Sequence, residues 1–165
     1  MITLRTFQLE DQERILQTVT DKIVNRTYML PDFPQQEDAI PLFNRLMTLS
    51  NDAARYVRCI SKDKEAIGFL NDVESKDGRI ELGYVIHPAF HGQGYMTEAL
   101  KMAIGELFAM GYAEVICGAF TENAASIRVM EKAGMQRMEF TENIDYRGTT
   151  HLCVYYSTKK EDTEC

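Results

Sequence analysis

The sequence of 165 residues contains no long apolar run and no excess of basic residues, and each absence removes a class of function. Without about 18 consecutive apolar residues, it predicts no membrane-spanning helix, and it shows no secretion signal. The net charge of −7 argues against nucleic acid as a partner, because such proteins carry a basic face. This charge is compatible with simple solubility or with attraction of a cationic substrate.

Cysteine is also scarce, and its spacing matches no metal-binding or redox motif. The four residues are Cys59, Cys117, Cys153 and Cys165. We therefore expect reduced, mostly buried thiols in a cytoplasmic protein, and no bound metal ion.

The length and the composition, with 45% hydrophobic and 26% charged residues, are typical of one globular domain spanning residues 1–165. The charged tail, residues 159–165, is predicted to be disordered.

The first third of the chain predicts one strand followed by two helices. Residues 2–7 alternate like a strand, and residues 9–29 and 37–49 carry apolar side chains at helical spacing. Pro31 and Pro34 separate the helices, and Pro41 should lie in the first turn of the second. An apolar cluster between them is compatible with a core or with the wall of an acceptor pocket; its members are Tyr28, Met29, Leu30 and Phe33.

The central part predicts an antiparallel meander of three strands over residues 54–61, 66–73 and 79–87. Turns at residues 62–64 and 76–78 separate them, and the second contains Asp-Gly, a strong hairpin signal. Glu81 lies inside the third strand, where carboxylates are uncommon. It is either a solvent-facing side chain or a functional group.

A glycine loop, His91–Met96, follows the third strand and precedes an amphipathic helix over residues 95–110. Gly92 and Gly94 permit left-handed backbone angles and close approach of a ligand. The first amides of a helix lack intrahelical partners and carry partial positive charge, so they can bind a diphosphate. A Gly-x-Gly pattern alone is equally compatible with a plain turn.

The remaining residues predict a right-handed crossover and a closing hairpin. Gly111 should end the helix, and residues 113–120 should form a buried parallel strand. Asn123 should cap a further helix, with Ser126 at its third position. The hairpin pairs residues 135–143 with 149–157. Its loop contains Tyr146 and Arg147, which either border an acceptor site or only connect the strands.

Together these motifs resemble the GNAT N-acetyltransferases. The resemblance rests on Pro88, the loop His91–Met96, Asn123-x-x-Ser126 and Glu131–Met135, and it covers residues 2–159. The pattern is most similar to the RimJ/RimL-type branch, which acetylates protein N-termini and, in relatives, small amines. The resemblance implies an α/β (α+β) fold: a mixed, mostly antiparallel central sheet with helices on both faces.

Two positions depart from the family pattern. The loop begins with His91 where the family has Gln or Arg, and it ends with Met96 where the family has Gly or Ala. Since backbone amides bind the phosphates, we expect binding to persist. Met130 occupies the position of the usual tyrosine acid and cannot donate a proton, whereas a serine matching Ser126 is the substitute in the RimJ/RimL-type branch.

The resemblance implies direct transfer of an acetyl group from acetyl-CoA to a primary amine, either a protein N-terminus or a small molecule. Glu81 is the candidate base and Ser126 the candidate acid, although Ser126 is also compatible with support of the helix cap. A backbone amide near Val85 or Ile86 is the candidate donor to the oxyanion. The predicted cofactor-binding residues are Val85, Ile86, His91, Gly92, Gln93, Gly94, Tyr95, Met96, Thr97 and Asn123.

One alternative function is a CoA-binding sensor or scaffold that keeps the fold without turnover. A dinucleotide-binding unit is disfavoured, because the glycine loop follows a meander and no acidic strand end follows about 20 residues on. No partner is predicted for His87 or His151, and the protein is expected to be a monomer or homodimer with no nucleic-acid or membrane partner.

Overall fold

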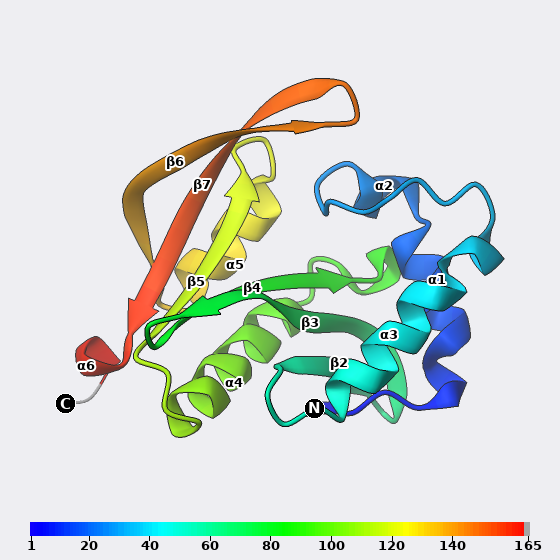
Figure 1. Ribbon diagram of the computed structural model, residues 1–165, viewed down its shortest axis with the longest axis horizontal. Helices are drawn as coiled ribbons and strands as arrows, with labels where there is room; N and C mark the ends of the chain where they lie inside the picture. The colour runs from blue at the N-terminus through cyan, green and yellow to red at the C-terminus, as the bar shows by residue number, and fades with distance from the viewer. Residues whose placement is uncertain (164–165) are drawn as a thin grey trace. The chain divides into compact units, whose positions relative to one another are not determined.

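The structure is a computed structural model, and it describes residues 1–163 (Figure 1). Seven strands form a sheet in the order β1-β2-β3-β4-β5-β7-β6. The sheet is mixed and mostly antiparallel, which confirms the fold class that the resemblance implies. The chain divides into two compact units. The first contains Met1–Asp72 and Tyr84–Ala99, and the second contains Val73–Gly83 and the chain from Leu100 onward.

After β1 the chain forms a group of helices, then three consecutive strands, and then helices and strands in the order α4, β5, α5, β6, β7 and α6. The strands are β1 (Ile2–Arg5), β2 (Val57–Lys62), β3 (Glu65–Lys76), β4 (Arg79–Ile86), β5 (Glu114–Phe120), β6 (Gln136–Tyr146) and β7 (Thr149–Lys159). The α-helices are α1 (Gln12–Val19), α2 (Lys22–Asn25), α3 (Ile40–Ser50), α4 (Tyr95–Ala109), α5 (Ala124–Lys132) and α6 (Lys160–Thr163). Short 3-10 turns are η1 (Leu9–Asp11), η2 (Gln36–Ala39) and η3 (Pro88–Phe90).

The first unit contains the antiparallel pairs β1–β2 and β2–β3, and the second of these is the first pair of the predicted meander. The turn between β2 and β3 is left-handed at Asp63 and Lys64, a backbone typical of tight hairpins. Helices α1 and α3 pack an apolar face that includes Ile15, Val19 and Phe43, all fully buried. Pro41 lies in the first turn of α3, as predicted.

The long helix predicted over residues 9–29 is wrong in its extent, because the chain forms η1, α1 and α2 instead. Asp21 takes an extended backbone and its carboxylate accepts hydrogen bonds from the amides of Ile23 and Val24. A side chain that caps a new helix competes with continuation of the old one, so the helix restarts there.

The second unit contains the parallel pair of β4 and β5, with Arg79–Leu82 in register with Glu114–Cys117. This agrees with the predicted crossover through α4. Strand β7 pairs antiparallel with β5 on one side and with β6 on the other. The β6–β7 hairpin, orange to red in Figure 1, turns through Arg147 and Gly148, both left-handed.

The chain end predicted to be disordered contains the last residue of β7 and helix α6, which ends at Thr163. Residues 164–165, including Cys165, lie outside the described residues. Cys59, Cys117 and Cys153 are buried and form no disulfide. None of the described helices is long and apolar enough to cross a membrane.

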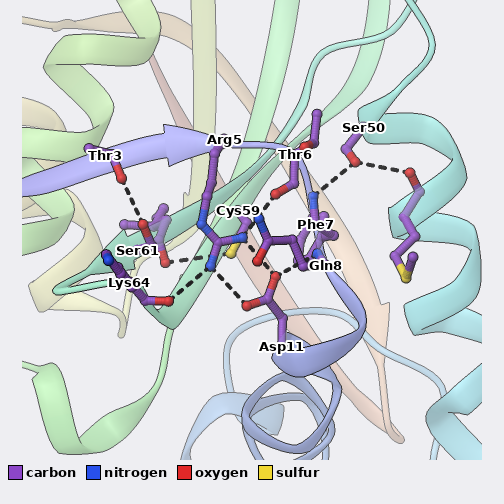
Figure 2. A network of polar contacts seen from close by, with 12 residues as sticks. Thr3, Arg5, Thr6, Phe7, Gln8, Asp11, Ser50, Cys59, Ser61 and Lys64 are labelled. Atoms are coloured by element: carbon purple, nitrogen blue, oxygen red, sulfur yellow. Dashed lines mark hydrogen bonds and ion pairs between the residues drawn. The ribbon is translucent and has the colours of Figure 1, made fainter.

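Within the first unit, an ion pair with a buried carboxylate joins the end of β1 to η1 (Figure 2). Arg5 donates two hydrogen bonds to the Asp11 carboxylate, at 2.8 and 2.9 Å, and the amide of Gln8 donates a third at 2.7 Å. Only 4% of Asp11 is exposed. Burial alone would raise the pKa of this carboxyl, but the bonds from Arg5 and Gln8 outweigh burial and hold the pKa below its ordinary value.

We predict that Arg5→Ala lowers the free energy of unfolding at pH 7 by about 3 kcal/mol, because Asp11 would stay buried without its cation. The lowered pKa makes this stabilisation present above about pH 4 and lost as the pH falls further. Urea unfolding at pH 7 and pH 3 measures both effects. The exposed Arg45 on α3 supplies the control, Arg45→Ala. An equal difference between wild type and Arg5→Ala at both pH values would contradict the assignment.

Candidate active site

The glycine loop is the junction between η3 and α4 in the first unit. Gly92 and Gly94 have φ angles of +73° and +81°, so both use the left-handed backbone that the sequence suggested. A Cβ atom added to either glycine would meet no atom within 4 Å. The amides at the start of α4 therefore follow an exposed turn, the arrangement that suits a bound anion.

The loop is held in place by hydrogen bonds to the end of β4. His91 donates from Nε2 to the carbonyl oxygen of Ile86 at 2.9 Å, so the first residue of the motif braces the loop against the strand. Gln93 donates to the carbonyl of Ala89 at 3.3 Å, and the amide of Ala89 donates to Nδ1 of His87 at 3.0 Å. None of these bonds was predicted from the sequence.

Two predicted cofactor residues in the first turn of α4 turn their side chains toward the protein. Met96 is buried, so its bulk fills the core and only its backbone is available to a ligand. Tyr95 is half-buried and packs beside Phe90, and the ammonium of Lys62 lies 5.7 Å from its ring centroid. Thr97 is half-buried on the next position of the helix.

Glu81 lies in the second unit, on β4 beside Ile116 of β5. The register places its side chain on the face that carries Ile116, Gly118 and Tyr155. Glu81 is half-buried, which excludes the interpretation of a freely solvated side chain. Burial, together with the negative charges of Glu74 and Glu142, raises the pKa of this carboxyl above its ordinary value.

Asn123 and Ser126 form the predicted cap of α5, in the same unit. The Oδ1 atom of Asn123 accepts a hydrogen bond from the amide of Ser126 at 3.1 Å. The donor in this bond is the backbone N–H of Ser126, not its side chain. Met130, one turn further along, is fully buried and belongs to the core.

The sequence missed a paired histidine in the second unit. His151 on β7 contacts the Glu122 carboxylate through Nδ1 and stacks on Phe120, with ring centroids 4.3 Å apart and planes 10° apart. Tyr146 lies beside both rings, and the Arg147 guanidinium lies 5.2 Å from the Tyr146 ring centroid. These partners are 29 residues apart in sequence, so only the pairing of strands brings them together.

The apolar cluster between the predicted helices is mostly core. Tyr28 donates to the side-chain oxygen of Asn71 at 2.6 Å and packs edge-on against Phe69, and Leu30 is buried. Met29, in contrast, is 52% exposed. Among residues 1–163, no group of three or more His, Cys, Asp or Glu side chains is arranged to hold a metal ion.

Residues 1–136 match the family model of the acetyltransferase (GNAT) domain. The chain belongs to the GNAT family of N-acetyltransferases.

Known proteins resemble the chain over most of its length. It is 28% identical over 143 residues to the uncharacterized N-acetyltransferase p20 of Bacillus licheniformis, covering 82% of this chain and 79% of that protein. A GNAT-family acetyltransferase structure from Bacillus anthracis superposes with a TM-score of 0.83 at 23% identity, covering 97% and 95% of the two chains. The spermidine N-acetyltransferase of Vibrio cholerae, in complex with CoA and spermine, has a TM-score of 0.81 at 15% identity, covering 97% and 96%.

We predict that Gly94→Val weakens binding of acetyl-CoA by about 10- to 100-fold, because each lost charge-assisted hydrogen bond is worth about 1.5–3 kcal/mol. Isothermal calorimetry measures the change. The matched control is Gly134→Val, since Gly134 also has positive φ, at +89°, and also faces open space. Wild-type affinity in Gly94→Val, or an equal loss in Gly134→Val, would show that the phosphates bind elsewhere.

Proposed function

We propose that this protein transfers an acetyl group from acetyl-CoA to a primary amine by direct attack within a ternary complex. The observation that carries the proposal is the pair of left-handed glycines directly before α4. The experiment that tests it is acetyl-CoA consumption over a panel of peptides, amino acids, polyamines and aminoglycosides. Binding of acetyl-CoA without consumption by any amine would instead indicate a CoA sensor.

The pyrophosphate of acetyl-CoA would accept hydrogen bonds from the amides of Gly92–Thr97. The partial positive charge at the start of α4 adds to these bonds, so no lysine is required. The amide of Val85 or Ile86, at the end of β4, would donate to the acetyl oxygen as negative charge develops there. The side chain of Asn123 caps α5, and we also assign it to the cofactor contacts.

The acceptor amine must be neutral to attack the thioester, and Glu81 is the residue we assign to remove its proton. An α-amine, with a pKa of about 7.7–8, is partly neutral at physiological pH, whereas a lysine-type amine, at about 10.4, is almost fully charged. A carboxyl with a raised pKa accepts a proton more readily near neutrality, which suits the role.

The charges around Glu81 favour an acceptor that arrives as a cation. Glu74 and Glu142 add two negative charges in its neighbourhood, and the whole chain carries a net charge of −7. The Vibrio cholerae relative of this fold binds spermine, a polycationic amine. A small-molecule amine and a protein N-terminus are both compatible with this environment, and both are included in the panel.

The leaving thiolate needs a hydrogen bond or a proton, and we assign this role to the hydroxyl of Ser126. The cap bond to Asn123 uses the backbone amide of Ser126, and Ser126→Ala keeps this amide. The match of Asn123-x-x-Ser126 to the RimJ/RimL-type branch supports the same assignment.

We predict that Glu81→Gln lowers kcat/KM by about 10²–10⁴-fold near neutrality, as expected for loss of a general base. For an α-amine acceptor the deficit should shrink toward pH 9, because the nucleophile is then already neutral. For a lysine-type or polyamine acceptor the deficit should persist. The measurement is kcat/KM against pH for both proteins, and identical profiles would remove Glu81 from the mechanism.

Glu74→Gln is the matched control for this experiment. Glu74 is exposed, and its charge contributes to the raised pKa of Glu81. Removing that charge lowers the pKa of Glu81, so the acid limb of the kcat/KM profile should move to lower pH while the plateau stays. An unmoved limb would indicate that the titrating group is not Glu81.

We predict that Ser126→Ala lowers kcat more than it raises KM for acetyl-CoA, since the hydrogen bond strengthens only as the thiolate forms. Met130→Leu, a change of similar volume inside the core, should leave turnover nearly intact. Steady-state kinetics on both variants gives the ranking, and the reverse order would assign the leaving-group role elsewhere.

A further inference from the structure

The end of β4 lies unusually close to one glycine of β3. A Cβ atom added to Gly68 would lie 2.2 Å from the carbonyl oxygen of Val85, 2.9 Å from Cα of Ile86 and 3.1 Å from the carbonyl carbon of Val85. Ordinary contact between such atoms is about 3.5 Å. All three obstacles are backbone atoms, which cannot rotate aside as a side chain can.

The distances also give the direction of the Val85–Ile86 peptide. The carbonyl oxygen of Val85 is nearer to the Gly68 position than its carbon is, so the C=O bond points toward β3. No described peptide bond is cis, and in a trans peptide the C=O and N–H bonds point to opposite sides. The N–H of Ile86 is therefore directed away from β3.

Two hydrogen bonds hold the next peptide along the chain, Ile86–His87, which shares Ile86 with the Val85–Ile86 peptide. The amide of His87 donates to the carbonyl of Ile67 at 2.7 Å, and Ile67 is the extra residue of a bulge, because Gly68 pairs with Ile60 and Ala66 with Ser61. On the other side of the peptide, His91 donates to the carbonyl of Ile86 at 2.9 Å. The bulge in β3 and the glycine loop thus brace the same two residues.

We propose that Gly68 is a positioning residue for acetyl transfer: its missing side chain lets the Val85 carbonyl approach β3 and thereby aims the Ile86 amide at the acetyl oxygen. This rests on the proposed function, and it selects Ile86 over Val85 as the donor. Any side chain at position 68 would push the peptide out of this orientation. The donor would then be misplaced even though no residue that touches the substrate has changed.

The test is Gly68→Ala, with kcat and the affinity for acetyl-CoA measured separately. An amide that acts on the oxyanion is used mainly in the transition state, so we expect kcat to fall about 10²-fold while the dissociation constant of acetyl-CoA changes by less than about threefold. Gly105→Ala in α4 is the control glycine, because its Cβ would meet nothing within 4 Å. Val19→Ala, in the buried face of α1, controls for loss of stability.

Infrared spectroscopy measures the stretching frequency of the acetyl carbonyl, which general destabilisation of the protein would not change. With acetyl-CoA labelled with ¹³C at the carbonyl, a hydrogen bond from Ile86 lowers the stretching frequency in wild type, in Gly105→Ala and in Val19→Ala, and the lowering is lost in Gly68→Ala. Should Gly68→Ala fail to fold, the ¹H–¹⁵N spectrum of wild type decides: the Ile86 amide must move downfield with acetyl-CoA more than with CoA.

The outcomes separate this inference from the proposed function. Wild-type kcat or an unchanged carbonyl band in Gly68→Ala, or an Ile86 amide that does not respond to the acetyl group, overturns the role of Gly68 while acetyl transfer stands. Failure of the wild-type protein to bind acetyl-CoA at all, seen by calorimetry, overturns both.

Discussion

The left-handed backbone at Gly92 and Gly94 is the constraint on which the candidate site depends. These residues let the chain leave β4 and enter α4 without covering the first amides of the helix. The two flanking elements fix the position of the turn, since Val85 and Ile86 are buried on one side and Ala99 and Leu100 on the other. The turn with its two glycines is therefore held between two buried segments, which is the arrangement that a preorganised anion site would require.

Two carboxyl groups, Asp11 and Glu81, have pKa values shifted in opposite directions by their surroundings. Asp11 is the more deeply buried, yet its pKa is lowered, because Arg5 and the Gln8 amide stabilise its charge. The pKa of Glu81 is raised, because burial acts in the same direction as two further carboxylates. Negative charges beside a half-buried carboxylate destabilise its charged form and so work against folding. Acids with pKa values raised in this way are concentrated at functional sites.

The sequence was sufficient where a single residue dictates local geometry. Asp-Gly at 77–78, Pro41, Gly111, Asn123 and the glycine loop were all predicted correctly in position and in conformation. Prediction failed where two possibilities compete locally or where partners are distant in sequence. The apolar residues keep their helical spacing past Asp21, but the cap formed by Asp21 ends one helix and begins another. Helix α6 forms in a tail whose composition suggested disorder.

The distant pairs could not be found from the sequence for a different reason. Glu122 and His151, and likewise Gly68 and Val85, meet through strand register, and no local pattern marks one member as the partner of the other. Gly68 sits in an apolar strand where a glycine has no evident use. Its role is evident only from the structure, where the backbone of β4 approaches it closely.

The burial of the cysteines bears on the sulfur chemistry of the reaction itself. Burial is the main cause that raises the pKa of the Cys59 thiol to about 12, and it also raises the pKa values of Cys117 and Cys153. Exchange with a disulfide requires a thiolate that can be reached. An acetyltransferase that uses acetyl-CoA releases CoA, which carries a reactive thiol. Among the described residues, burial protects the three cysteine sulfurs from forming mixed disulfides with that product or its oxidised forms.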